Sequence, residues 1–118
     1  MNKERKSSLS FLITVQVRTP RGEKTVLALV DSGAEANFVS QYWAKTQDLE
    51  NQAKVSRLVK AIDGRTVRTF GEYKFPVSAT DSNGVTGTAN QHFYAVDLTA
   101  YNMILGFPWL KKINPDIN

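Results

Sequence analysis

The sequence predicts an all-β fold, a barrel or a sandwich, with one short helix near the C-terminus. Many short segments alternate apolar and polar residues, and this period of two is typical of strands with one buried face. Turn-forming residues separate these segments at short intervals, as at Asp63-Gly64 and Asn83-Gly84. Short strands divided by such turns favour a closed barrel or a sandwich.

The alternation begins in residues 9–18, where one face carries four apolar side chains: Phe11, Ile13, Val15 and Val17. Residues 19–22 contain proline and glycine and predict a turn. The next strand, residues 24–30, ends in a run that is apolar on both faces. Such a run predicts a strand buried in the middle of the molecule.

The centre of the chain predicts shorter elements. A short apolar strand precedes Ser40, whose hydroxyl is suited to cap a brief helix. Residues 49–60 fit a helix in their middle, but the apolar side chains towards their end favour a strand. Asp63-Gly64 predicts a tight hairpin turn with positive φ, and residues 66–70 form the strand after it.

The last third of the chain predicts a second hairpin, with strands at residues 73–80 and 85–96. A short apolar strand at residues 103–105 then leads through Gly106 into a closing helix that ends near Lys112. A proline stands in the first turn of that helix, where the missing N–H breaks no helical hydrogen bond.

The length of 118 residues predicts one domain. Residues 1–8 predict a disordered lead-in, residues 9–113 the folded domain and residues 114–118 a C-terminal connector. No apolar run is long enough to span a membrane, and the N-terminus lacks the apolar core of a signal peptide. We therefore expect a cytoplasmic location and no membrane contact.

The composition narrows the chemistry. The chain has no cysteine and a single histidine, His92, which excludes thiol catalysis and argues against His-based triads, metal sites and cofactors. The formal net charge of +4 motivates a nucleic-acid-binding β-barrel as a minor hypothesis. Because the basic residues are scattered among acids and form no basic-aromatic stripe, we do not expect nucleic-acid binding.

One motif carries chemistry. Asp31-Ser32-Gly33 directly follows the apolar strand, and a carboxylate placed there needs partners to offset its burial. By itself the triplet fits two interpretations: a turn aspartate that caps the residues after it, or a catalytic carboxylate. By itself, Ile104-Leu105-Gly106 likewise fits a buried strand with a glycine at the turn.

Together these two segments resemble the retropepsin family of aspartic peptidases, and most closely the peptidase domains of gypsy-type LTR retrotransposon polyproteins. The resemblance rests on ALVDSGAEANFVS at residues 28–40 and MILGFPWL at residues 103–110, and it extends loosely over residues 11–117. It implies a single-lobe retropepsin-like barrel. Residues 111–117 are similar to the connector that such polyproteins carry ahead of reverse transcriptase.

Peptide hydrolysis by carboxylates needs two of them close together with one shared proton, so that one acts as base on water and the other as acid on the carbonyl. This sequence has one D-[ST]-G triplet and is too short for two lobes. We therefore expect the second aspartate from another copy of the chain, in a C2 homodimer that places two identical loops face to face.

The resemblance implies a role for each residue of the loop. Asp31 is the shared acid and base, and the Ser32 hydroxyl is expected to bond across the dimer axis. Gly33 and Ala34 are small where the backbone turns and the substrate approaches. Gly106 is expected to pack closely behind the catalytic loop, where a side chain would displace it.

Peptide binding is implied for Gly33, for Glu35 and for the tip of the first predicted hairpin. Glu35 stands where retropepsins often place an acid that accepts substrate N–H groups, and a solvated turn acid is the alternative. Four tip residues occupy the place of a flap that closes over the substrate: Ala61, Ile62, Asp63 and Gly64. A plain surface hairpin is the alternative there.

The sequence thus predicts an aspartic endopeptidase that acts as a homodimer on a peptide or polyprotein substrate. Its expected role is to mature a retroelement polyprotein, in the cytoplasm or in a retroelement particle. The alternative is a catalytically silent domain of the same fold that serves in dimerisation or peptide binding. The intact Asp-Ser-Gly triplet favours the peptidase, because a silent domain has no need for the aspartate.

Overall fold

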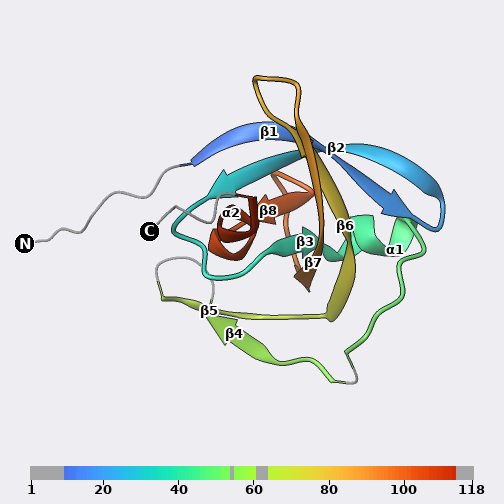
Figure 1. Ribbon diagram of the computed structural model, residues 1–118. Helices are drawn as coiled ribbons and strands as arrows, with labels where there is room; N and C mark the ends of the chain where they lie inside the picture. The colour runs from blue at the N-terminus through green and yellow to red at the C-terminus, as the bar shows by residue number, and fades with distance from the viewer. Residues whose placement is uncertain (1–9, 54, 61–63, 114–118) are drawn as a thin grey trace, which may run out of the picture.

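Figure 1 shows the computed structural model of the chain, which describes residues 10–53, 55–60 and 64–113. Its barrel strands are β1 (Ser10–Thr19), β2 (Gly22–Asp31), β3 (Phe38–Ser40), β6 (Gly71–Thr80), β7 (Thr86–Val96) and β8 (Met103–Leu105). A separate two-stranded sheet contains β4 (Leu58–Lys60) and β5 (Thr66–Arg68), and the helices are α1 (Gln41–Thr46) and α2 (Phe107–Ile113). The predicted mostly β, closed-barrel fold with a C-terminal helix is confirmed.

The barrel closes in the order β1-β2-β8-β3-β7-β6. Two long antiparallel hairpins, β1–β2 and β6–β7, form most of its wall. Strand β8 is buried at all three residues, and it pairs in parallel with β2 and antiparallel with β3. It therefore lies between the strand that ends at Asp31 and the strand that follows the loop after Asp31.

Strands β1 and β2 each bury one face, as wall strands of a barrel do. In β1, Val15 and Val17 are buried, but Phe11, predicted on the same face, is 47% exposed near the start of the strand. The prediction that the end of β2 is buried on both faces is wrong, because Leu27 is 50% exposed. Leu27 pairs with Thr14, and side chains alternate between the two faces of a strand, so both lie on the outer face of the wall.

The main core fills the barrel and anchors both helices. The rings of Phe75 and Phe93 stack with their centroids 4.4 Å apart. Trp43 from α1 and Trp109 from α2 belong to the same buried cluster, and each buried aromatic removes roughly 150–250 Å² from water. Burial also raises the pKa of the Tyr73 phenol, which therefore remains uncharged at neutral pH.

Both helices begin where the sequence predicted. Ser40 accepts a 3.1 Å hydrogen bond from the Trp43 N–H, which confirms it as the cap of α1. Helix α2 starts directly after Gly106, whose carbonyl accepts hydrogen bonds from the N–H groups of Trp109 and Leu110 at 3.1 and 3.2 Å.

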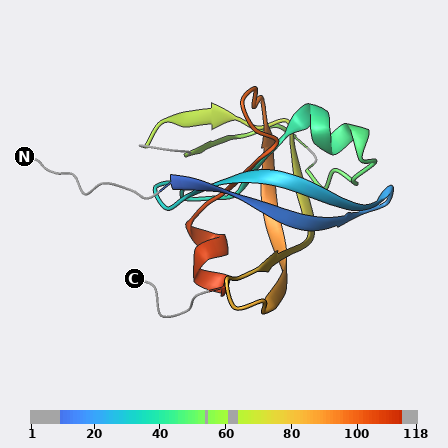
Figure 2. The same ribbon diagram turned by 90° about the horizontal axis from the view of Figure 1, so that it is seen from above.

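Strands β4 and β5 form the first predicted hairpin, here called the β4–β5 hairpin. Lys60 pairs with Thr66, and Gly64 has the positive φ, +76°, that its turn predicted. The other tip residues, 61–63, lie outside the described residues. The hairpin lies outside the barrel. Strand β4 runs towards the end of the molecule at which β2 ends, and β5 runs back from it (Figures 1 and 2).

The base of the β4–β5 hairpin is tied to the barrel through polar contacts. The Thr69 N–H donates a 2.8 Å hydrogen bond to the Arg57 carbonyl, which joins the two arms of the hairpin at its base. The Arg57 guanidinium lies 3.1 Å from one carboxylate oxygen of Glu72, whose other oxygen lies 3.1 Å from His92 Nε2. Since Glu72 and His92 belong to β6 and β7, these contacts fix where the hairpin leaves the barrel.

The predicted lead-in at residues 1–8 and the predicted connector at residues 114–118 lie outside the described residues. Within the described part of the chain, no helix is long and apolar enough to cross a membrane.

Candidate active site

Asp31 is the last residue of β2 and is only 8% exposed. Its Oδ1 accepts a 2.9 Å hydrogen bond from the Gly33 N–H. Its carbonyl accepts a second bond, at 3.0 Å, from the Ala34 N–H, which closes a tight turn. The carboxylate is therefore held by its own loop. A buried acid needs a hydrogen-bond partner, and the Gly33 N–H provides one.

The loop is clamped against the start of α2. The Phe107 N–H donates a 2.9 Å hydrogen bond to the Ala34 carbonyl. A Cβ added at Gly106 would lie 2.3 Å from the Ala36 carbonyl oxygen and 2.6 Å from that of Ala34. Because both obstacles are backbone atoms, only glycine fits here without displacing the loop that carries Asp31.

Asn37 joins this loop to two strands, a role that the sequence did not reveal. It is 2% exposed, and its Oδ1 accepts a 2.9 Å hydrogen bond from the Gly106 N–H. That backbone donor fixes the orientation of the amide, so Nδ2 is the donor to Gln91 Oε1 at 2.9 Å and to the His92 carbonyl at 3.2 Å. One available signal was its position directly before the apolar Phe38-Val39, where a buried asparagine needs several partners.

A cavity of about 780 Å³ opens beside the loop. One wall contains four residues that the sequence predicted for the site: Ser32, Gly33, Ala34 and Glu35. The other wall is α2, with Phe107, Pro108, Lys111 and Lys112. Glu35 is exposed on the rim of this cavity.

The β4–β5 hairpin belongs to a second cavity, of about 400 Å³. Gly64, the one predicted tip residue that the structure describes, is exposed and lines neither cavity. The structure therefore places Ser32, Gly33, Ala34 and Glu35 at one cavity, which Asp31 itself does not line, and part of the hairpin at another. Ala61, Ile62 and Asp63 lie outside the described residues.

The loop carries two carboxylates, the nearly buried Asp31 and the exposed Glu35. Among the described residues, no group of three or more histidine, aspartate or glutamate side chains is arranged to hold a metal ion.

A single-lobe closed barrel that carries Asp-Ser-Gly at the end of a wall strand, with a glycine packed behind it, defines a retropepsin-like protease domain. Residues 27–118, more than three quarters of the chain, match the family model of the PEG10/RTL1 protease domain. The chain belongs to this family. A comparison with curated proteins gives no significant match.

Proposed function

We propose that the chain is an aspartic endopeptidase that hydrolyses peptide bonds as a homodimer. The observation that carries the proposal is the placement of Asp31. This carboxylate is nearly buried at the end of β2 and is oriented by the Gly33 N–H, and the loop residues after it line an open cavity. A turn aspartate without further function has no need for a loop that is clamped by Gly106 and Asn37.

Hydrolysis in this proposal uses Asp31 from each of two copies. One carboxylate accepts a proton from the attacking water while the other, protonated, donates to the peptide carbonyl. The sequence contains one Asp-Ser-Gly triplet, so one chain cannot supply both groups. A two-fold axis between the loops brings the same carboxylate from both copies to one peptide bond.

The loop residues around Asp31 receive supporting roles. The Ser32 hydroxyl bonds across the axis, and Gly33 lets the peptide backbone approach. Glu35, on the cavity rim, accepts N–H groups of the peptide. The substrate is a retroelement polyprotein that the enzyme cuts in the cytoplasm or in a particle, in keeping with the resemblance to such polyproteins.

The test is cleavage of a mixed peptide library by the purified protein, with and without pepstatin, a statine-type mimic of the tetrahedral transition state. We expect cleavage that pepstatin abolishes. Asp31→Asn should lose all detectable turnover and keep its circular dichroism spectrum, because the amide oxygen can still accept the Gly33 N–H. Asp48→Asn is the matched control, since Asp48 is exposed and asparagine tolerates its positive φ.

Undiminished cleavage by Asp31→Asn would contradict the assignment of the catalytic residue. A wild-type protein that binds peptides and dimerises, but never cuts them, would instead support the silent module.

A further inference from the structure

The second cavity combines an apolar floor with a charged rim. Its apolar lining comes from the barrel and from the β4–β5 hairpin: Phe38, Val67, Phe70, Val96, Leu98 and Ile104. Three charged residues complete the lining, Arg65, Arg68 and Asp97. With a volume of about 400 Å³, the cavity has room for an aromatic or branched aliphatic side chain.

This cavity is continuous with the packing beneath the catalytic loop. Phe38, Val96 and Ile104 form one buried cluster with Ala34, and Val67 of the hairpin packs against that cluster. Ile104 also pairs with Leu29 of β2, two residues before Asp31. A side chain seated in the cavity therefore belongs to a peptide that passes close to the loop.

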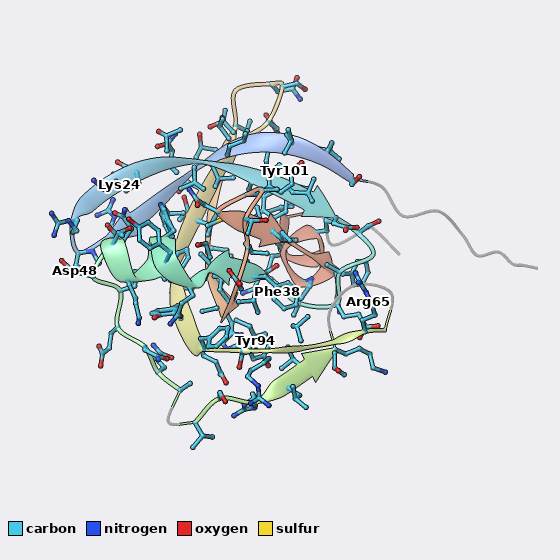
Figure 3. The ribbon with its side chains drawn as sticks, turned by 180° about the vertical axis from the view of Figure 1, so that it is seen from behind. Lys24, Phe38, Asp48, Arg65, Tyr94 and Tyr101 are labelled. Atoms are coloured by element: carbon cyan, nitrogen blue, oxygen red, sulfur yellow. The ribbon has the colours of Figure 1, made fainter. Side chains whose placement is uncertain are left out.

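The two arginines differ in how they are held. Arg68 donates a 3.1 Å hydrogen bond from Nη1 to the Ser56 hydroxyl. Arg65 has no partner within the part of the chain that the structure describes, and it forms no ion pair there with Asp97. Figure 3 shows Arg65 at the end of the molecule opposite Lys24. Two cations against one carboxylate leave the rim with a net positive charge.

The spacing of Arg65 relative to Val67 decides what the rim can recognise. Val67 lies in β5 and Arg65 directly before that strand, and both residues line the cavity. In a bound extended peptide, side chains two positions apart project to the same side. The peptide side chain two positions from the one in the cavity therefore faces the rim. These two peptide side chains are roughly 7 Å apart along the peptide, a distance that the long side chain of Arg65 can span.

We propose that Arg65 makes this cavity select peptides that carry a bulky apolar residue with an acidic residue two positions away. The inference rests on the proposed function in taking the ligand to be an extended peptide. It adds a preference for acidic peptides. The loop of Asp31 does not supply this preference, because its own charged side chains, Asp31 and Glu35, are carboxylates.

The experiment uses the full chain with Asp31→Asn, so that peptides bind without being cut. The probes are synthetic octapeptides with phenylalanine, and with glutamate, glutamine or lysine two positions before or after it. We expect at least one glutamate peptide to bind about threefold more tightly than its glutamine counterpart, as befits an exposed ion pair. This ratio should shrink as salt is added.

The Arg65→Gln variant should bring the glutamate-to-glutamine ratio to one. Arg18→Gln is the matched control, because Arg18 is an exposed arginine of β1 and lines neither cavity, and it should leave the ratio unchanged. Replacing the phenylalanine of the peptide by alanine should weaken binding to both proteins.

Three results would each overturn the inference: equal affinities for glutamate and glutamine peptides, tighter binding of the lysine peptide through Asp97, or no binding at all.

The experiments also distinguish a failure of this inference from a failure of the proposed function. Peptide cleavage by the wild-type chain without a glutamate preference would refute the inference alone, whereas a glutamate preference without any cleavage would refute the peptidase alone.

Discussion

Asn37 holds the candidate site together more than any neighbour of Asp31 does. Its amide bonds to the β8–α2 junction at Gly106 and to β7 at Gln91 and His92. All three bonds are shielded from water to a large degree, and a buried polar group left without its partner costs more than the bond itself contributes. The position of the catalytic loop thus depends on a side chain that takes no part in the proposed chemistry.

Asn37→Leu should therefore lower the free energy of unfolding by about 1–3 kcal/mol, because the Gly106 N–H and the Gln91 amide lose their partner. Urea denaturation of both proteins measures this difference. Asn90→Leu serves as the control, since Asn90 is exposed on β7 and its replacement should have little effect. Equal loss in the two variants would mean that the hydrogen bonds of Asn37 do not stabilise the loop.

At the scale of elements, the β4–β5 hairpin has a firm base and a turn that depends on glycine. The bond from Thr69 to Arg57 joins its two arms, and the contact of Arg57 with Glu72 ties its base to the barrel. At the turn, Gly64 has φ +76° and no atom within 4 Å of an added Cβ. A side chain there meets no steric obstacle from neighbours, so only the backbone conformation opposes it.

Gly64→Val should lower kcat/KM for peptide cleavage without changing dimerisation, because a β-branched residue at positive φ costs about 1–3 kcal/mol and distorts the turn. Gly87→Val is the control, since Gly87 also has open space around its Cα but lies in β7 with negative φ. Peptide kinetics and sedimentation of both variants test this. Wild-type efficiency in Gly64→Val would make the β4–β5 hairpin a plain surface feature.

At the scale of the whole molecule, the proposed mechanism needs Asp31 from two chains, so it predicts that activity depends on both. Mixing the wild type with roughly a ninefold excess of Asp31→Asn should lower the activity per wild-type chain about tenfold, because random pairing leaves few dimers with two aspartates. The measurement is initial rate after subunit exchange. Activity that simply follows the wild-type concentration would show that one chain is sufficient.

The same pair predicts how the rate depends on pH. A carboxyl pair works in its singly protonated form, so the rate should fall on the acidic side when both groups are protonated and on the alkaline side when the shared proton is lost. We expect a maximum between about pH 4 and 6.5, because repulsion between two neighbouring carboxylates retains the shared proton to higher pH than a lone carboxyl does. Peptide cleavage at constant ionic strength measures the profile, and a maximum above neutrality would contradict the carboxyl mechanism.

The sequence by itself determined the elements that depend on neighbouring residues. Alternation predicted the long strands, the Ser40 hydroxyl predicted the start of α1, and Asp63-Gly64 predicted a turn with positive φ at Gly64. Each of these signals acts over a few residues, where local backbone preference and hydrogen bonding are sufficient. The Asp-Ser-Gly triplet likewise marked the candidate site, because a carboxylate after an apolar strand is costly to bury.

Only the tertiary structure decided which distant residues meet. Asn37 bonds to Gly106 across 69 residues and to Gln91 across 54, and no local pattern specifies either partner. The exposure of Leu27 also depended on the barrel, because an apolar run does not say which of its faces the fold will cover. Contacts between distant segments arise when the whole chain closes its core, so the positions of Asn37 and Arg65 became visible only in the folded molecule.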